Sequence, residues 1–252
     1  MAKLPAVRFI LAYLLSTAVA AGGVLTQAGD AAFMHHLAAA LGADVAVLWI
    51  PTLDPCDEPW FGVACNGAGR VTSITVRGLR LNGSLPSDMC VLAWLETLDV
   101  SHNLISGALP GIWPTRLNTL RLDNNLFTEV PIQCFVDLRE LLFFSASNNW
   151  LLRPWELPHR QLRRITNLST FDVNNAGLVG GVAHFLGDEG DGAFPLLGRV
   201  SLARNKLSGS LPEKFGTQKL DELDLSHNGL SGPITSVAGL VNMRMLHMNS
   251  NN

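Results

Sequence analysis

Leucine and similar apolar residues recur along the chain in a fixed frame, with polar or small residues at the positions between them. The frame reads L-x-x-L-x-L-x-x-N-x-L-x-G-x-L-P, and valine, isoleucine, phenylalanine or methionine can stand in place of leucine. Eight copies begin at Val71, Leu95, Leu117, Leu141, Leu168, Leu197, Leu220 and Met243. Their starts lie 22 to 29 residues apart, and self-similarity at such a period indicates a solenoid that adds one coil per repeat.

The L-x-L core of each copy predicts a short strand. Side chains alternate between the two faces of a strand, so the two leucines point inward and the residues that flank them point to solvent. One coil cannot bury its leucines alone, so neighbouring coils stack and their strands form one parallel sheet. Frame and spacing are those of leucine-rich repeats. The sequence therefore predicts an α/β fold, a right-handed leucine-rich-repeat solenoid with a parallel concave β-sheet.

The asparagine at the ninth position of the frame is expected to turn the chain out of the strand. Its side-chain amide can hydrogen-bond to backbone groups of the turn and of the adjacent coil, which no strand pairs. Leu79 and Ala176 replace this asparagine in the first and fifth copies. The fourth copy runs through Asn149 to Leu151, which predicts that Leu151 is buried.

The first twenty residues have the composition of a secretory signal peptide. Lys3 and Arg8 give a basic start, an apolar run follows from Phe9 to Ala20, and Ala18-Val19-Ala20 is a small-x-small cleavage site. An N-terminal anchor helix is the alternative, but the run is short for a membrane span, and polar and helix-breaking residues follow it. We expect residues 1–20 to be removed and the mature chain to enter the secretory pathway with no transmembrane segment.

Composition and motifs exclude several classes of function. The net charge of −3 gives no basic footprint for nucleic acid. The segment Gly187 to Gly192 looks like a phosphate or calcium loop, but it lacks the Lys-Ser/Thr of a P-loop and the closing Glu of an EF-hand. The kinase motifs V-A-I-K, H-R-D and D-F-G do not occur, and neither does the G-x-S-x-G nucleophile elbow of hydrolases. We therefore predict a binding module with no catalytic residue, no metal site and no cofactor.

A short motif follows the strand in several repeats. The G-x-L-P element marks the plant-specific subclass, and it occurs as Gly83-Ser84-Leu85-Pro86, Gly107-Ala108-Leu109-Pro110 and Gly209-Ser210-Leu211-Pro212. Ahead of the first repeat stand Asp54-Pro55-Cys56, Trp60, Gly62-Val63, Cys65 and Arg70-Val71-Thr72. This segment resembles the N-terminal cap of plant leucine-rich-repeat receptors.

A second set of sequence motifs indicates a particular subfamily of these receptors. It comprises Trp155-Glu156-Leu157-Pro158, Phe185-Leu186-Gly187 and Phe194-Pro195. They resemble the irregular middle repeats of the transmembrane-kinase (TMK) subfamily of receptor-like kinases, and the resemblance covers the chain from roughly Asp54 to its end. Cys90 and Cys134 are departures from that family's pattern.

The resemblance implies a helical, disulfide-bonded cap over residues 21–70, followed by about eight repeats over residues 71–252. A helix from about Asp30 to Leu41 would cover the open end of the solenoid, and a Cys56–Cys65 disulfide would hold the loop that carries Trp60. Cys90 and Cys134 lie two repeats apart, about 10 Å at the strand spacing, which is beyond the reach of a disulfide. We expect both to be buried free thiols.

The candidate binding residues are the outward positions of the concave strands, whose mixed polar character suits a protein or peptide partner. They are Arg77, Asp99, His102, Arg121, Asp123, Asn124, Asp172, Asn174, Arg204, Asp224 and His227. Many of them are expected to be merely solvated. Asn82 and Asn167 each begin an N-glycosylation sequon; Asn167 adjoins a core leucine.

The resemblance implies the ligand-binding part of a receptor-like kinase ectodomain, outside the cell or on the outer face of the plasma membrane. Implied partners are a protein or peptide ligand, a co-receptor ectodomain and, through the TMK likeness, an apoplastic auxin-binding protein. The alternative is a freestanding secreted inhibitor or decoy that acts on a cell-wall hydrolase or another receptor. A stable solenoid needs a capped end, and the sequence stops inside its eighth repeat, which favours a fragment.

Overall fold

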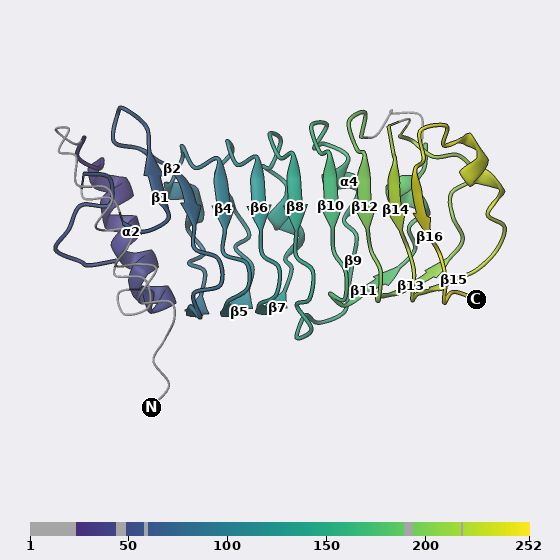
Figure 1. Cartoon of the computed structure of the whole chain (residues 1–252), viewed down its shortest axis with the longest axis horizontal. Coiled ribbons are helices and arrows are strands. Elements are labelled where there is room, and N and C mark those ends of the chain that lie inside the picture. Colours follow the sequence, from purple (N-terminus) through teal and green to yellow (C-terminus); the bar gives the residue numbers. More distant parts are fainter. Residues whose placement is uncertain (1–23, 44–48, 58–59, 189–193, 218) are drawn as a thin grey trace.

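Each L-x-L core forms one short strand, and these strands follow one another in chain order along one face of the molecule (Figure 1). The computed structural model describes residues 24–43, 49–57, 60–188, 194–217 and 219–252, so the predicted signal peptide and most of the segment from Gly187 to Gly192 lie outside the described residues. The sheet contains β1 (Val63–Cys65), β2 (Val71–Thr75), β4 (Thr97–Asp99), β6 (Thr119–Arg121), β8 (Phe143–Ser145), β10 (Thr170–Asp172), β12 (Arg199–Ser201), β14 (Glu222–Asp224) and β16 (Met245–His247).

The strands from β2 to β16 pair in parallel, and the two inward residues of each L-x-L core from β2 to β14 point away from solvent. Leu98, Leu122 and Leu225 are 0% exposed. The parallel register places the same frame position of successive repeats side by side, as in Leu98 opposite Leu120. The predicted leucine-rich-repeat solenoid is therefore confirmed. The antiparallel pairing of β1 with β2 was not predicted; it follows from the short turn that joins these two strands.

A helix covers the first coil, as the sequence predicted, and it begins two residues earlier than expected. This helix, α2 (Ala28–Leu41), lies at the N-terminal end of the sheet (Figure 1). Its buried carboxylate, Asp30, accepts hydrogen bonds from Arg70 Nε at 3.0 Å, from another Arg70 nitrogen at 2.8 Å and from the Val71 backbone N–H at 2.9 Å. These bonds fasten the first turn of the helix to the first repeat strand.

Two cysteine pairs behave differently. Cys56 and Cys65 form a disulfide with their Cα atoms 5.8 Å apart. Cys90 and Cys134 are free thiols; Cys134 is buried, but Cys90 is exposed, so the prediction that both are buried was wrong. Cys90 stands two residues before the buried Leu92, whereas Cys134 stands four residues before the equivalent Leu138. The two thiols therefore point to different sides of their coils.

Past the concave strand, each coil contributes to a second, narrower band of pairing. One sheet contains β3 (Asn82–Ser84), β5 (Leu104–Ala108) and β7 (Leu126–Glu129), and the other contains β9 (Trp155–Glu156), β11 (Leu178–Gly180), β13 (Lys206–Gly209) and β15 (Gly229–Leu230). The band is interrupted between β7 and β9, where the chain makes an excursion below the ribbon (Figure 1). Short helical turns complete the coils as η1 (Met89–Val91), η2 (Ile132–Phe135), α4 (His159–Leu162), α5 (Ala183–Leu186) and η3 (Thr235–Gly239).

The irregular path of the chain between β7 and β9 changes one predicted core position, because Leu151 was predicted to be buried. Leu151 is 39% exposed, and Leu152 is buried in its place. In a regular coil the asparagine of the next repeat accepts the N–H of the eleventh residue, as Asn125 Oδ1 does from Ile105 at 3.1 Å. The fifth repeat has Ala176 instead, and Leu152 N–H donates to Asn149 O within a local turn at 3.0 Å. That turn shifts the buried leucine by one residue.

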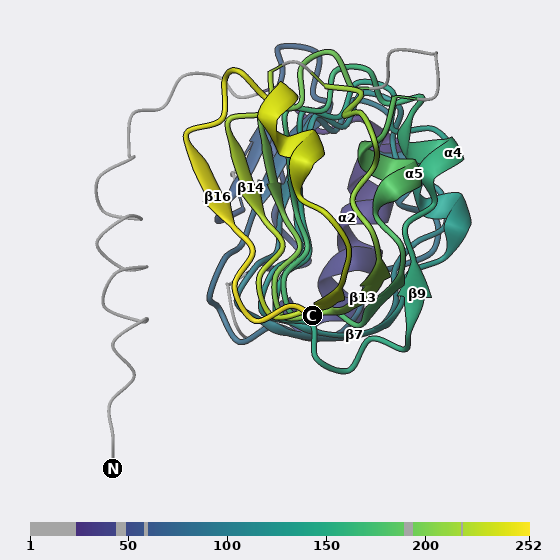
Figure 2. The ribbon, with the colours of Figure 1, turned by 90° about the vertical axis from the view of Figure 1, so that its right-hand side faces the viewer.

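The helices α4 and α5 lie on the side away from the concave sheet (Figure 2). Between them and the sheet, a row of phenylalanine rings replaces the leucines of the earlier repeats. Its neighbouring ring centroids are 5.1 to 5.3 Å apart, and its members are Phe135, Phe144, Phe171, Phe185 and Phe194. This aromatic core runs through the third, fourth and fifth coils, and the fourth and fifth are the two longest. In the described part of the chain, no helix has both the length and the apolar character needed to cross a membrane.

Candidate functional site

The outward residues of the parallel strands form one continuous surface, which we call the concave face. Because the side-chain period is two, the third, fifth and seventh frame positions all point out of the solenoid. The parallel register then aligns each position into a column that crosses the repeats. The predicted candidates come from these columns and from the turn that follows them.

Four predicted candidates are engaged by backbone groups at the ends of the strands. Asp99 Oδ1 accepts from the Ser101 N–H at 3.0 Å and from its hydroxyl at 2.6 Å. Asp224 makes the same two contacts with Ser226 at 2.9 and 2.7 Å. Bonds of this kind satisfy N–H groups that no strand pairs.

Asp123 and Asn174 act across coils instead. Asp123 Oδ1 accepts from the Ser147 N–H at 2.8 Å, and Asn174 Oδ1 accepts from the Ala203 N–H at 2.7 Å. With Asp99 8% exposed and the other three half-buried at most, these side chains first of all hold the sheet together. They contribute to the surface mainly through the charge of the three aspartates.

The C-terminal half of the concave face carries a charged cluster, of which only Asp172 and Asp224 were predicted as candidates. Arg199, on β12, lies between Asp172 on β10 and Glu222 on β14, and its guanidinium forms ion pairs with both. Its Nε is 3.2 Å from each Asp172 carboxylate oxygen. Burial raises the pKa of Asp172, and the positive charge of Arg199 acts in the opposite direction without cancelling it. Asp172 is therefore a desolvated carboxylate whose charge depends on its arginine partner.

A small hollow adjoins this cluster. It has a volume of about 130 Å³, and its lining includes Arg199, Glu222, Asp224, Met245 and His247. The imidazole Nδ1 of His247 is 3.7 Å from Asp224 Oδ2. The hollow thus places an aliphatic thioether beside an arginine, two carboxylates and an imidazole. We call these residues, together with Asp172, the Arg199 cluster.

The middle of the concave face offers a different contact. The Arg121 guanidinium carbon lies 4.1 Å from the centre of the Phe143 ring, a cation–π arrangement. Both side chains are half-buried. Arg121 was predicted as a candidate, whereas Phe143 was not.

One rim of the concave face is defined by the eighth frame position, just before the ninth-position asparagine. Every copy has a positive φ there, at Gly78, His102, Asn124, Asn148, Asn175, Arg204, His227 and Ser250. The left-handed conformation turns these side chains outward along a single edge, and asparagine tolerates it better than most residues.

Hydrogen bonds connect the neighbouring members of this rim. His102 Nε2 is 3.1 Å from an Arg77 nitrogen and 3.3 Å from Asn124 Nδ2. Asn148 Nδ2 donates to Asn124 Oδ1 at 3.2 Å, and Asn175 Nδ2 donates to Asn148 Oδ1 at 3.3 Å. His227 and Arg204 are exposed farther along the same edge. Among the residues that the structure describes, no group of three or more His, Cys, Asp or Glu side chains could hold a metal ion.

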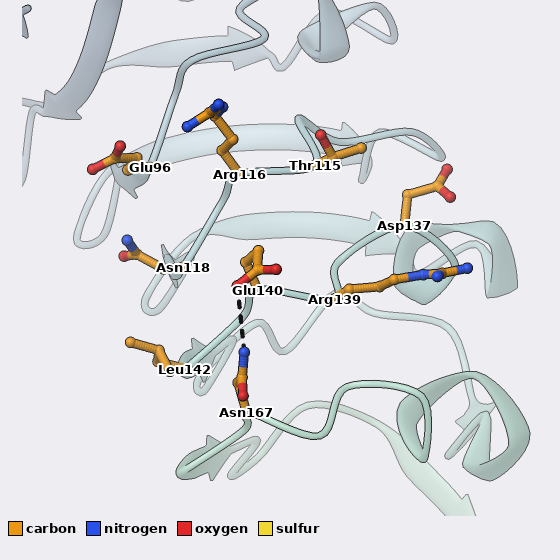
Figure 3. A pocket seen from close by; sticks show the side chains of 9 residues that line it. All are labelled: Glu96, Thr115, Arg116, Asn118, Asp137, Arg139, Glu140, Leu142 and Asn167. Atoms are coloured by element: carbon orange, nitrogen blue, oxygen red, sulfur yellow. Dashed lines mark hydrogen bonds between the residues drawn. The ribbon is translucent and has the colours of Figure 1, made fainter.

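The opposite rim contains a trough of about 870 Å³ (Figure 3). It is lined by Glu96, Thr115, Arg116, Asn118, Asp137, Arg139, Glu140, Leu142 and Asn167. The lining residues all come from the loops that lead into β4, β6, β8 and β10. Asn167 Nδ2 donates to Glu140 Oε2 across the trough at 3.3 Å.

Comparisons with known proteins agree with this geometry. The family model described as Leucine Rich Repeat matches residues 94–115 and 219–240. The chain is 27% identical to the receptor-like kinase TMK2 of Arabidopsis thaliana over 230 residues, which cover 79% of this chain and 25% of TMK2. The crystal structure of PEPR1-AtPEP1 is similar with a TM-score of 0.75 at 26% identity, over 90% of this chain and 32% of that chain. The chain has the fold of plant leucine-rich-repeat ectodomains.

This leucine-rich-repeat module spans about a quarter of TMK2, and it spans 16% of Protein STRUBBELIG-RECEPTOR FAMILY 3 of Arabidopsis thaliana, to which it is 36% identical over 126 residues covering 50% of this chain. The predicted resemblance to receptor-like kinases that include the TMK subfamily is therefore confirmed. The module matches only part of each of these proteins.

Four of the concave-face residues that were not predicted share one frame position, and His247, at the fifth position, was also not predicted. Phe143, Arg199, Glu222 and Met245 are all third-position residues, two before the fifth-position candidates. The frame itself marks the third position as outward, so their side chains could have been proposed from the sequence. The trough is harder to foresee, because it depends on how the loops before β6, β8 and β10 are spaced.

Proposed function

We propose that the module is the extracellular recognition part of a plant receptor kinase, and that its concave face binds a protein or peptide ligand. The Arg199 cluster carries this proposal. It is the place on the concave face where a partly exposed cation, two carboxylates, an imidazole and an apolar methionine converge on a hollow. Such a mixture can recognise a peptide through charge pairs and one apolar anchor.

The comparisons support a peptide ligand in particular. The plant peptide hormone receptor RGFR1, solved in complex with RGF2, is 26% identical to this chain with a TM-score of 0.59, over 77% of this chain and 37% of that chain. The PEPR1-AtPEP1 structure has the same identity and a higher TM-score. By analogy, we propose that an extended peptide lies across the concave strands, with the Arg121–Phe143 pair as a second contact.

Signalling would follow from association of the ligand-bound module with a co-receptor ectodomain at the plasma membrane. Phosphoryl transfer belongs, in this proposal, to a kinase domain of the receptor and not to the residues described. Delivery to the secretory pathway rests on the signal-peptide pattern of residues 1–20. An apoplastic auxin-binding protein as partner rests on the TMK resemblance alone.

The experiment uses an array of synthetic random peptides, probed with the secreted module. Peptides that bind saturably are then titrated against Arg199→Glu and against Arg153→Glu. Arg153 is a matched control because its side chain is 78% exposed and forms an ion pair with Glu129, away from the concave sheet. We expect Arg199→Glu to weaken binding by about tenfold or more, or about 1.4 kcal/mol, and the control to leave binding unchanged. Equal affinities for the Arg199→Glu variant and the parent chain would place binding elsewhere.

A further inference from the structure

The trough on the second rim is built by residues on either side of the first frame leucine. Arg116, Glu140 and Asn167 immediately precede Leu117, Leu141 and Leu168, which are 0% exposed. The leucine side chains are buried, whereas the side chains beside them line the trough. Asn118 and Leu142 follow two of these leucines and lie on the same side of the trough (Figure 3). The trough thus has a row of hydrogen-bonding groups and one partly exposed aliphatic side chain, Leu142, which is 42% exposed.

Asn167 opens a glycosylation sequon, Asn167-Leu168-Ser169, and its amide nitrogen faces this trough. The amide nitrogen is the atom to which an N-linked sugar is attached. A glycosylated amide keeps one N–H, so the 3.3 Å bond from Asn167 Nδ2 to Glu140 Oε2 can persist while the sugar takes the place of the other hydrogen. The modification therefore requires no rearrangement of the rim.

We propose that Asn167 carries an N-linked glycan and that the first sugars of this glycan lie in the trough. Attachment forms a bond between Asn167 Nδ2 and C1 of the first sugar of a lipid-pyrophosphate-linked oligosaccharide. The bond between that C1 and the carrier pyrophosphate breaks, the lipid pyrophosphate leaves, and the amide gives up one proton. Attachment rests on passage through the secretory pathway, which the proposed function also requires.

The chemistry of the lining fits a carbohydrate. Sugar hydroxyl groups both donate and accept hydrogen bonds, and the trough offers the donors of Arg116, the carboxylate of Glu140 and the amide of Asn118, which does both. Leu142 supplies an apolar patch against which a C–H face of a sugar ring can pack. A ligand that carried a single sign of charge fits less well, because arginines and carboxylates alternate along the lining.

The second sequon serves as an internal comparison. Asn82 is exposed on β3, in the narrow band of pairing, and is not part of the trough lining. Asn82 Oδ1 lies 3.3 Å from the position that a Cβ on Gly42 would occupy, so a glycan on Asn82 would begin beside the end of the cap helix. Because Asn82 is exposed, that glycan would extend into solvent. The two sites therefore predict different accessibility for glycans that are attached in the same compartment.

The test begins with the full chain produced in plant cells and mapped by glycopeptide mass spectrometry. We expect a glycan on Asn167 and its loss in Asn167→Gln and Ser169→Ala. The rate at which a peptide N-glycosidase removes each glycan is then measured on native and denatured protein. In the native protein, removal at Asn167 should be at least about tenfold slower than at Asn82, a factor that corresponds to about 1.4 kcal/mol of seating. Denaturation should abolish the difference.

Leu142→Asp should accelerate native removal at Asn167, whereas Leu104→Asp, at a similarly exposed leucine outside the trough, should not. An unmodified Asn167 in a chain that carries a glycan on Asn82 would overturn the proposal although secretion occurred. If Asn167 carries a glycan but the enzyme removes it from the native protein as fast as the glycan on Asn82, the proposal that its first sugars lie in the trough would be overturned. Absence of glycan at both sites would also overturn it, and peptide binding by the concave face would still be decided by the Arg199→Glu titration.

Discussion

At the scale of single residues, Asp54 joins two segments of the cap through one carboxylate. Its Oδ1 accepts from the Thr26 hydroxyl at 2.6 Å and from the backbone N–H groups of Cys56 and Asp57, both at 2.9 Å. The Thr26 N–H also donates to the carboxylate at 3.1 Å. Burial raises the pKa of Asp54, but these hydrogen bonds together outweigh it, so the pKa is lowered. A carboxylate held in this way links the stability of the cap to pH.

We therefore predict that acid loosens the cap through Asp54. Because its pKa is lower in the folded chain than in the unfolded one, its contribution is fully present above about pH 4, near the unfolded value, and is lost as pH falls through the folded value. Asp54→Asn should reduce the free energy of unfolding near neutral pH by about 1–3 kcal/mol. It should also flatten the pH dependence below about pH 4. Urea titrations at several pH values measure both effects, and an unchanged slope would contradict the linkage.

The two free thiols should differ sharply in reactivity. Burial raises the pKa of Cys134 to about 12, although the Trp113 indole N–H donates to its sulfur at 3.0 Å. The reactive species is the thiolate, and near pH 8 a group with so high a pKa is almost wholly protonated. We expect iodoacetamide to label Cys90 in the native chain and Cys134 only after unfolding. Mass mapping of native and urea-treated samples decides this, and native labelling of Cys134 would show that its coil opens readily.

Residue types could be predicted from the frame, but the partners of each side chain could not. Asp99, Asp172 and Asp224 all occupy the fifth position. Two of them accept from a serine two residues later in their own repeat, whereas Asp172 is followed at that place by Asn174 and pairs with Arg199 of the next repeat. An Asp-x-Ser pattern would have separated these cases. The Arg199 pairing, by contrast, requires knowledge of the stacking register.

At the scale of the coil, the ninth-position asparagine connects two repeats through three or more hydrogen bonds. Asn125 Oδ1 accepts from Ile105 N–H, and its Nδ2 donates to Val100 O of the preceding coil and to Leu122 O and Asp123 O of its own. Asn125 is 1% exposed. Removing its amide would leave several buried backbone groups unpaired, and each costs about 1–3 kcal/mol.

Asn125→Ala should therefore destabilise the chain by about 2–4 kcal/mol in total, since relaxation and water recover part of the loss. Asn118→Ala is the control, because this half-buried side chain accepts a hydrogen bond from the neighbouring Thr119 hydroxyl, and the change should lie within about 0.5 kcal/mol. Equilibrium unfolding in urea compares the two variants. Equal stabilities would mean that the turn amides find other partners.

The irregular coils mark the limit of prediction at this scale. The frame predicted every strand of the concave sheet from β2 to β16, because two inward leucines fix both position and face. It failed at Leu151, where the missing asparagine at Ala176 allowed a local turn to decide which leucine is buried. Trp155 fills part of that gap, since its indole N–H donates to Ala176 O at 2.8 Å. A side chain of one coil that replaces a missing contact in the next coil cannot be recognised from the sequence of a single repeat.

At the scale of the whole molecule, each coil contacts mainly its neighbours, so stability varies along the array. Leu98, between two coils, is 0% exposed, whereas Met245 and Leu246 on β16 are 48% and 36% exposed. In the described residues β16 pairs with β14 alone. Exposed apolar side chains on a strand with one free edge promote association between chains.

We predict that the isolated chain opens first from Met243 onward and tends to self-associate. Asn251 opposes this fraying, because its Nδ2 donates to Leu225 O at 3.0 Å and its Oδ1 accepts from Leu230 N–H at 3.0 Å. Opening should therefore be local, with amide protection in Arg244 to Asn249 well below that in Leu98 to Val100. Hydrogen exchange measured at several protein concentrations separates the two effects, since association should raise protection at β16 but leave β4 unchanged. Equal protection of both strands in a monomeric sample would show that the last coil is held as firmly as the interior, and the free edge of β16 would then not explain association.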